Sequence, residues 1–304
     1  MVPIIKPSAC FCFGLGYTAG FLLKKLQNQG WAVGGTVRDP EKQKKFLENG
    51  CSAYLLSPSH PIKNLSSLLQ DYTHVLFSIP PDCHGHDPFL RDYQDAFREI
   101  GHLAWIGYLS ATSVYGDQQG KWVDENTPPN PSTDRGHKRW SAEKEWWSLH
   151  RQSQLPIHVF RLSSIYGPGR NALANVLGGK VKLIDQPGQI FNRLHIDDII
   201  QVLWASMRQP RSGAVYNLAD DFPSSPAEVI RYACQLLGTE DLLPTSLDDP
   251  AISEMTRSFY QENKRVSNRL IKEELKVELL HPSYREGLED LWIKMATASN
   301  HKET

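Results

Sequence analysis

The sequence lacks an excess of either charge. Its 304 residues include 33 lysines and arginines against 34 aspartates and glutamates, which gives a formal net charge of −1. Such a balance provides no electrostatic reason to expect a nucleic acid or an anionic membrane surface as a partner. The 21 glycines and 20 prolines are spread along the chain without forming a low-complexity linker or a repeat. We therefore expect a globular protein with one large domain, or a domain with a smaller lobe.

Cysteines are few, and their spacing matches no metal-binding motif. The count is odd, and the five thiols are those of Cys10, Cys12, Cys51, Cys83 and Cys234. Cys10 and Cys12 lie two positions apart in an apolar run, so on a strand both would share one face. We interpret the five as buried thiols rather than disulfide partners, which favours a reducing, cytoplasmic compartment.

Long apolar segments are also missing. The uncharged stretch at 7–23 is interrupted by three glycines, has only Lys6 as a basic residue close before it, and is followed by no small-residue cleavage site. These features argue against an export signal. Since no other segment approaches the ~20 apolar residues that a membrane span needs, we expect no membrane partner.

A glycine-rich turn near the start carries the first functional signal. Residues 8–13 predict a buried strand, residues 21–29 a helix and residues 31–38 the next strand, with GLGYTAG between the first strand and the helix. In this order the first glycine permits a tight turn, and the second lets the backbone approach a pyrophosphate at the helix N-terminus. Dinucleotide binding is predicted for Gly14, Gly16, Tyr17, Thr18 and Ala19. The alternative is a glycine-rich turn that binds nothing.

The end of the second predicted strand bears on the type of cofactor. An acidic residue that binds the ribose is expected there, but the strand ends in Thr36, Val37 and Arg38, followed by Asp39. Arg38 is placed to pair with a ribose 2′-phosphate, and no carboxylate precedes it. We therefore predict NADP(H), with NAD(H) as the alternative if Arg38 is merely solvated and Asp39 binds the ribose.

Helices and strands alternate along most of the chain. The predicted elements are helix 40–50, strand 51–56, strand 73–81, helix 87–100, strand 104–116, helix 137–152, strand 155–169, a helix within 181–209, strand 214–220 and helix 224–238. This alternation predicts an α/β fold, a Rossmann-type doubly wound parallel sheet, with a smaller mixed C-terminal substrate lobe. We expect a dinucleotide-binding domain at 1–168, to which 195–219 return, and a substrate lobe at 169–194 and 220–304.

Six segments in this order resemble the extended short-chain dehydrogenase/reductases, the group of nucleotide-sugar epimerases and dehydratases. They are GLGYTAG, YLSATSVYGD, WVDENTPPNP, FRLSSIYGPGR, NRLHIDDI and YNLADDFP. The resemblance implies an NAD(P)-binding core, a lobe that closes a cleft over a small-molecule substrate, possibly of nucleotide-sugar type, and a homodimer through the helix that carries the catalytic Tyr. Trp140, Trp146 and Trp147 would lie on or near that helix, and either a dimer interface or burial within the monomer would explain them.

The resemblance fails at the catalytic positions. The family uses a Ser or Thr, a Tyr, and a Lys four residues after the Tyr, and these positions hold Ala111, Arg135 and Arg139 here. An arginine cannot act as a base near neutral pH. Arg139 could still bind the cofactor ribose or a phosphate, and Ser110, beside the empty position, is a further predicted cofactor contact. Because strand side chains alternate, Thr112 would face the same way as Ser110 and opposite to Ala111.

Other candidates for substrate contact are Arg135, Thr112, Arg193 and the loop with His84 and His86. His84 or His86 could transfer protons. The residue types of this loop could bind zinc, but the sequence places no second group of ligands, so we predict no metal. Arg193 would bind a substrate anion, or alternatively form an ion pair with Asp197 or Asp198.

Two functions remain open. The first is an atypical NADP(H)-dependent oxidoreductase or epimerase-like enzyme, with proton transfer from water or from the histidine loop. The second is a non-catalytic NADP(H)-binding sensor or partner-binding protein, which the loss of all three catalytic groups makes more credible. The substrate lobe and the segment around Arg193 favour the enzyme.

Overall fold

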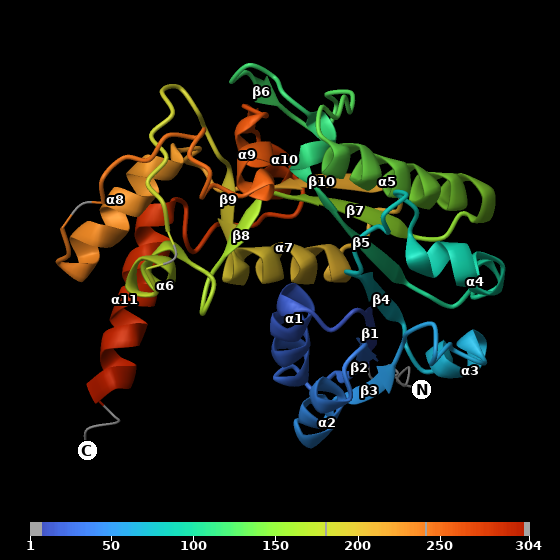
Figure 1. Ribbon diagram of the computed structural model, residues 1–304. Coiled ribbons are helices and arrows are strands. Elements are labelled where there is room, and N and C mark those ends of the chain that lie inside the picture. Colours follow the sequence, from blue (N-terminus) through green and yellow to red (C-terminus); the bar gives the residue numbers. More distant parts are fainter. Residues whose placement is uncertain (1–7, 180, 241, 301–304) are drawn as a thin grey trace. The chain divides into compact units, whose positions relative to one another are not determined.

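The computed structural model describes residues 8–179, 181–240 and 242–300 (Figure 1). The first half contains β1 (Ala9–Phe13), α1 (Tyr17–Gln27), β2 (Ala32–Val37), α2 (Pro40–Glu48), β3 (Ser52–Leu55), α3 (Leu65–Leu69), β4 (His74–Phe77), α4 (Pro88–Arg98), β5 (Trp105–Ala111), the 3₁₀ helix η1 (Thr112–Tyr115), β6 (Trp122–Val123) and α5 (Asp134–Ser153). The second half contains β7 (Ile157–Leu162), β8 (Ser164–Tyr166), α6 (Ala172–Leu177), β9 (Arg193–His195), α7 (Ile196–Arg208), β10 (Ala214–Leu218), α8 (Pro226–Leu237), α9 (Glu254–Tyr260), β11 (Arg265–Val266), α10 (Arg269–Glu273) and α11 (Tyr284–Asn300).

Seven strands form one sheet in the order β10-β7-β5-β4-β1-β2-β3. The pairs β1–β2, β1–β4, β2–β3 and β4–β5 are parallel. The central strands β1, β4 and β7 are buried along their whole length, as expected of strands that are covered on both faces. The predicted α/β fold with a Rossmann-type parallel sheet is confirmed.

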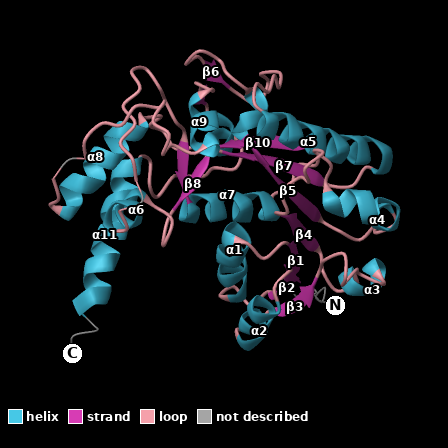
Figure 2. Cartoon of the chain, viewed as in Figure 1, coloured by secondary structure: helices cyan, strands magenta, loops and turns pink. Residues whose placement is uncertain are grey.

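Helices lie on both faces of the seven-stranded sheet (Figure 2). On one face Phe77 packs against Phe89 of α4 and Trp146 of α5, in a core that also includes residues of α3. On the other face the indole N–H of Trp105 donates to Ser206 Oγ of α7 at 3.0 Å. The sheet therefore has helices on both sides, which leaves the strand ends and their loops to form binding sites.

The chain divides into two compact units, each described here by itself. The first unit comprises Met1–Ser110, His137–Arg161 and Ile200–Tyr216 and holds almost all of the seven-stranded sheet. The second unit comprises Ala111–Gly136, Leu162–Ile199 and Asn217–Thr304. The domain limits predicted from the sequence remain a prediction, because a compact unit need not be an independently folding domain.

The second unit contains two short parallel strand pairs and most of the later helices. β8 pairs with β9, and β6 pairs with β11. A separate core joins α6, α8 and α11 through Leu173, Ala233 and Leu288. Ser225 caps α8 by accepting from the Glu228 amide while the Glu228 carboxylate accepts from the Ser225 amide, which together form a capping box.

Three details differ from the sequence predictions. The strand predicted at 104–116 ends at Ala111, and Thr112 begins η1, so strand alternation does not place Thr112 beside Ser110. Helix α5 begins at Asp134, three residues before its predicted start. Cys83 is exposed, so the buried-thiol interpretation is wrong there, whereas Cys10, Cys12, Cys51 and Cys234 are buried and form no disulfide.

Among the residues that the structure describes, we find no helix with the length and apolar character that a membrane span requires.

Candidate functional site

The turn between β1 and α1 has a backbone that only glycine adopts readily. Gly14 has φ +91, and a Cβ there would lie 3.0 Å from Ile79 Cγ1. Its amide donates to Thr36 Oγ1 at 2.9 Å, and its carbonyl accepts from Ser78 Oγ at 2.5 Å. The ends of β2 and β4 thus hold the first glycine of the fingerprint in place, and the tight turn follows from its positive φ.

Gly16 plays a different role, because the position that a Cβ would occupy is open space. It is the N-cap of α1, is exposed, and would place a Cβ with no heavy atom within 4 Å. No side chain caps the helix, and no acidic residue lies in its first turn. The amides of the first turn, which includes Tyr17, Thr18 and Ala19, therefore face outward with the positive end of the helix dipole. A pyrophosphate fits this turn by charge, by hydrogen bonding and by the open space over Gly16.

At the end of β2, Arg38 is exposed and open to a ligand, whereas Asp39 caps the next helix. Arg38 is exposed directly after the strand. Asp39 caps α2, and its Oδ1 accepts from the Glu41 amide at 2.8 Å. Because this cap already employs the Asp39 carboxylate, the ribose contact considered for it would compete with the start of α2.

Behind the end of β5 lies a buried ion pair that the sequence did not reveal. Glu143 of α5 is 0% exposed, and its Oε1 accepts from Arg161 Nη2 of β7 at 2.6 Å. Its Oε2 accepts from the Ser110 hydroxyl at 2.6 Å. Ser110 is therefore tied to the core of the first unit by its side chain. Its predicted contact with a cofactor would rest on its backbone groups.

Arg139, at the position of the family's Lys, is anchored on β5. Its Nη1 donates to the Leu109 carbonyl at 3.0 Å and to the Tyr108 hydroxyl at 3.2 Å. Trp146 of the same helix is buried within the monomer and donates to Asp87 Oδ2 at 2.8 Å. Burial, one of the two explanations offered for the tryptophans, is confirmed for Trp146.

The remaining catalytic positions lie in the second unit. Ala111 is half-buried and lacks a hydroxyl group, and Thr112 is buried at the start of η1. The guanidinium of Arg135 lies over the ring of Phe259, with 3.7 Å between Cζ and the centroid. Burial lowers the pKa of Arg135, and the nearby Glu262 opposes this effect. Even so lowered, a guanidinium stays charged near neutral pH, so Arg135 can bind or orient an anion or a carbonyl but cannot serve as a base.

The histidine loop after β4 is organised by carboxylates. Asp82 Oδ1 accepts from the amides of His84 and His86 at 2.9 and 3.0 Å. His86 Nδ1 lies 2.6 Å from Glu145 Oε1, and this contact raises the pKa of the imidazole. Both histidines are exposed. His86 therefore favours the protonated form and could donate a proton, whereas Asp87, buried as the cap of α4, is committed to the fold.

Arg193 is held by uncharged oxygens in the second unit. Its Nη1 donates to the carbonyls of Phe191 and Ser224, each at 3.1 Å, and to Ser224 Oγ at 2.8 Å. Asp198, offered as an ion-pair partner, instead accepts from the amides of Leu280 and His281. Arg193 is thus fixed in orientation without being neutralised by these contacts.

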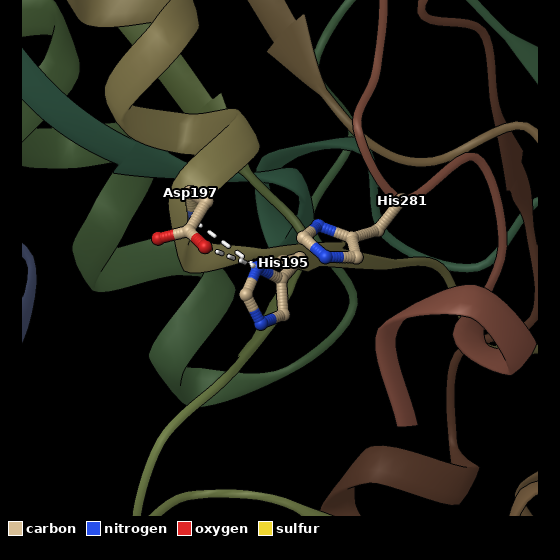
Figure 3. Close-up of side chains that lie close together, drawn as sticks. All are labelled: His195, Asp197 and His281. Carbon is tan, nitrogen blue, oxygen red and sulfur yellow. Dashed lines mark hydrogen bonds and ion pairs between the residues drawn. The ribbon is translucent and has the colours of Figure 1, made fainter. Parts of the chain in front are cut away.

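A cluster of possible metal ligands joins His195, Asp197 and His281, whose ligand atoms lie within 4.8 Å of one another (Figure 3). Two contacts work against coordination. His195 Nδ1 accepts from the Asp197 amide at 3.2 Å, and the imidazole rings of His195 and His281 are in contact, with centroids 3.9 Å apart and planes tilted by 48°. Burial and the neighbouring His281 lower the pKa of His195 to about 4, so a neutral ring lies against a second one that Asp198 holds. This arrangement is typical of a packed histidine pair.

Comparisons with known proteins agree with this geometry. The model of the NAD dependent epimerase/dehydratase family matches residues 97–219. Protein YeeZ from Escherichia coli (strain K12) is 30% identical over 239 residues, which are 75% of this chain and 83% of that protein. The structure of a functionally unknown conserved protein from Silicibacter pomeroyi has a TM-score of 0.87 and 43% identity, and the match covers 94% of this chain and 99% of that one. UDP-glucuronic acid 4-epimerase from Bacillus cereus, in complex with NAD, has a TM-score of 0.73 at 20% identity over 92% of this chain and 96% of that one, which shows a common fold.

Proposed function

Since the chain belongs to the NAD-dependent epimerase/dehydratase family, within the extended short-chain dehydrogenase/reductases, we propose that it binds a nicotinamide dinucleotide at the turn between β1 and α1. The observation that carries this proposal is the uncapped start of α1 together with the open space over Gly16. The proposal extends to NADP(H) rather than NAD(H), because Arg38 is exposed at the end of β2 and Asp39 is engaged as a helix cap.

We further propose that the protein is an atypical oxidoreductase or epimerase-like enzyme. The bound nicotinamide would supply or accept hydride. The first-turn amides of α1 would hold the pyrophosphate, and Arg139 would fix the ribose or a phosphate. Arg135 would orient an anionic or carbonyl group of the substrate, while a proton would come from water or from His86, whose pKa Glu145 raises.

Substrates of nucleotide-sugar type are supported only by likeness. The Bacillus cereus epimerase acts on UDP-glucuronic acid, as its description states. A sugar nucleotide is accordingly the first class to test here, beside simple carbonyl compounds. The homodimer through α5 is likewise supported only by the family resemblance, and it stays a prediction.

A second candidate function is a cofactor-binding protein without turnover. It is favoured by three observations: Ala111 has no hydroxyl, the Ser110 hydroxyl is bound to Glu143, and Arg139 is bound to the end of β5. Such a protein would bind NADPH as tightly as an enzyme does. It would report the cofactor to a partner through the loops around the site.

Hydride transfer distinguishes the two functions. Purified protein would be mixed with NADPH and a panel of sugar nucleotides and carbonyl compounds, and NADPH absorbance at 340 nm would be followed. Oxidation that depends on one substrate supports the enzyme. Epimerisation or dehydration returns the hydride to the substrate without net oxidation of NADPH, so the same panel incubated with NADP⁺ is also analysed for a changed sugar. Cofactor binding with neither NADPH oxidation nor a changed substrate favours the sensor, and absence of binding removes both.

A further inference from the structure

A row of two aromatic rings with an arginine at each end lies in the second unit. It consists of four side chains in contact sequence, namely Arg135, Phe259, Phe191 and Arg193. The Arg135 guanidinium lies 3.7 Å from the centroid of Phe259, the rings of Phe259 and Phe191 are 6.5 Å apart, and Arg193 lies 6.0 Å over Phe191. Tyr260 adds a third ring, 5.2 Å from Phe191. We call Arg135, Phe259, Phe191 and Arg193 the arginine–aromatic strip.

The strip is accessible to a ligand. Phe259 is 41% exposed, which is unusual for a large aromatic side chain. The other three members are half-buried. An arginine stacked on an exposed ring presents its flat face to the protein and its N–H fork outward, the geometry that binds carboxylate and phosphate.

At one end, Arg135 has no carboxylate of its own. The nearby Glu262 is already satisfied, because Oε1 accepts from Thr133 at 2.7 Å and Oε2 accepts from Lys264 at 2.7 Å. Arg135 Nε is buried and lacks a hydrogen-bond partner among the described residues. A partly buried guanidinium without a paired anion is costly, and an anion at its Nη groups would reduce that cost.

At the other end, Arg193 donates to three uncharged oxygens. The carboxyl group beside it is that of Asp220, which is 2% exposed and whose Oδ2 has no partner among the described residues. Burial raises the pKa of Asp220 to about 8, although Arg193 opposes the effect. The raised pKa weakens the compensation of Arg193 by Asp220, and the guanidinium donates its hydrogen bonds to neutral oxygens.

We propose that the arginine–aromatic strip is a binding site for small anionic ligands in which a carboxylate or phosphate pairs with Arg135 and a planar or apolar part lies on Phe259 and Phe191. The two guanidiniums select the acid, and the rings select the flat part. The inference rests on the proposed function in one respect: in an enzyme this ligand is the substrate. Anion binding by the strip does not require a cofactor at the turn between β1 and α1.

Fragment binding tests the strip directly. Phenyl phosphate and phenylacetate are titrated separately into the full-length protein and followed by ligand-observed NMR, beside uncharged benzyl alcohol and inorganic phosphate. At least one of the two aromatic acids should bind about tenfold or more tightly than benzyl alcohol, since a charge-assisted hydrogen bond is worth ~1.5–3 kcal/mol. Whichever acid is preferred identifies the anion. Equal binding of the acids and benzyl alcohol, or no binding, would overturn the proposal.

Variants assign the effect to the strip. Arg135→Gln should weaken the preferred acid about tenfold, as should Phe259→Ala, which changes an exposed ring and leaves the arginine in place. Arg269→Gln is the matched control, because this exposed arginine of the same unit pairs with Glu273 at 3.6 Å. If both strip variants remain folded by circular dichroism and bind like the parent, the site lies elsewhere and the inference fails.

NADPH binding measured on the same preparations separates the two proposals. Anion binding without NADPH binding would leave the strip intact and remove the proposed function. NADPH binding without anion binding would do the reverse.

Discussion

Replacing Gly16 with alanine should weaken cofactor binding without harming the fold. The added Cβ meets no heavy atom within 4 Å, and the backbone at φ −89 and ψ −162 is open to any L residue. The free energy of unfolding should therefore change by less than ~1 kcal/mol. The methyl group instead occupies the space through which a pyrophosphate approaches the first-turn amides of α1.

The expected loss can be worked from those amides. Loss of one charge-assisted hydrogen bond to phosphate costs ~1.5–3 kcal/mol, which weakens the Kd for NADPH by roughly 10- to 150-fold. Titration of the parent and of Gly16→Ala with NADPH, followed by the fluorescence of the reduced nicotinamide, gives this ratio. Urea unfolding of the same samples gives the change in stability.

Gly20→Ala is the matched control. This glycine lies in the second turn of the same helix, and a Cβ there also meets nothing within 4 Å. Its substitution should leave the affinity for NADPH unchanged and stabilise the helix by up to ~1 kcal/mol. If Gly16→Ala binds NADPH like the parent, or if both variants lose affinity alike, then the turn does not hold the pyrophosphate and the reasoning is refuted.

Three further predictions concern single side chains. Arg38→Ala should weaken NADPH about tenfold while leaving NADH unchanged, because only NADPH carries the 2′-phosphate; equal losses in paired titrations would contradict this role. Glu143→Gln should lower the free energy of unfolding in urea by ~3–5 kcal/mol, since it removes the buried negative charge that pairs with Arg161, whereas Glu273→Gln at an exposed pair should cost less than ~1 kcal/mol. Asp220 holds its proton more tightly in the folded state (pKa about 8) than in the unfolded chain (3.8), so the contribution of this group to stability is greatest at low pH and is lost as pH rises from about 4 to about 8, by at most roughly 6 kcal/mol. Asp220→Asn should remove this part of the pH dependence of the melting temperature, and parallel curves for parent and variant would show that the carboxyl is not buried as described.

The parts of the molecule that could be predicted from the sequence are those governed by local chemistry. The tight turn at Gly14 was readable because its positive φ needs glycine, and the central strands were readable because burial on both faces demands continuous apolar runs. The helix predicted at 224–238 is also found as α8, and its start is governed locally, since Ser225 and Glu228 form a capping box.

Contacts between distant segments could not be predicted in this way. No local pattern in the sequence predicts the role of Glu143. Its carboxylate forms the buried ion pair with Arg161 and also accepts from the Ser110 hydroxyl. The stacking of Arg135 on Phe259 joins residues more than a hundred positions apart. Neither has a local pattern, because tertiary packing alone brings the partners together.

The lobe was harder to predict than the sheet for a further reason. Its segments carry short elements such as β6 and β11, each of two residues, which pair only with each other. Helix α11 was also not recognised, although it runs over Tyr284–Asn300. The end of β5 shows the same limit on a smaller scale, since Thr112 is a β-branched residue that suits a strand but begins a 3₁₀ turn.

The central claim is that this chain holds a nicotinamide dinucleotide at the start of α1 although it lacks the family's usual catalytic groups. Titration of the unmodified, purified protein with NADPH, with NADH in parallel, tests it most directly. The account predicts saturable binding of one NADPH per chain, tighter than that of NADH. A folded protein that binds neither nucleotide would contradict it.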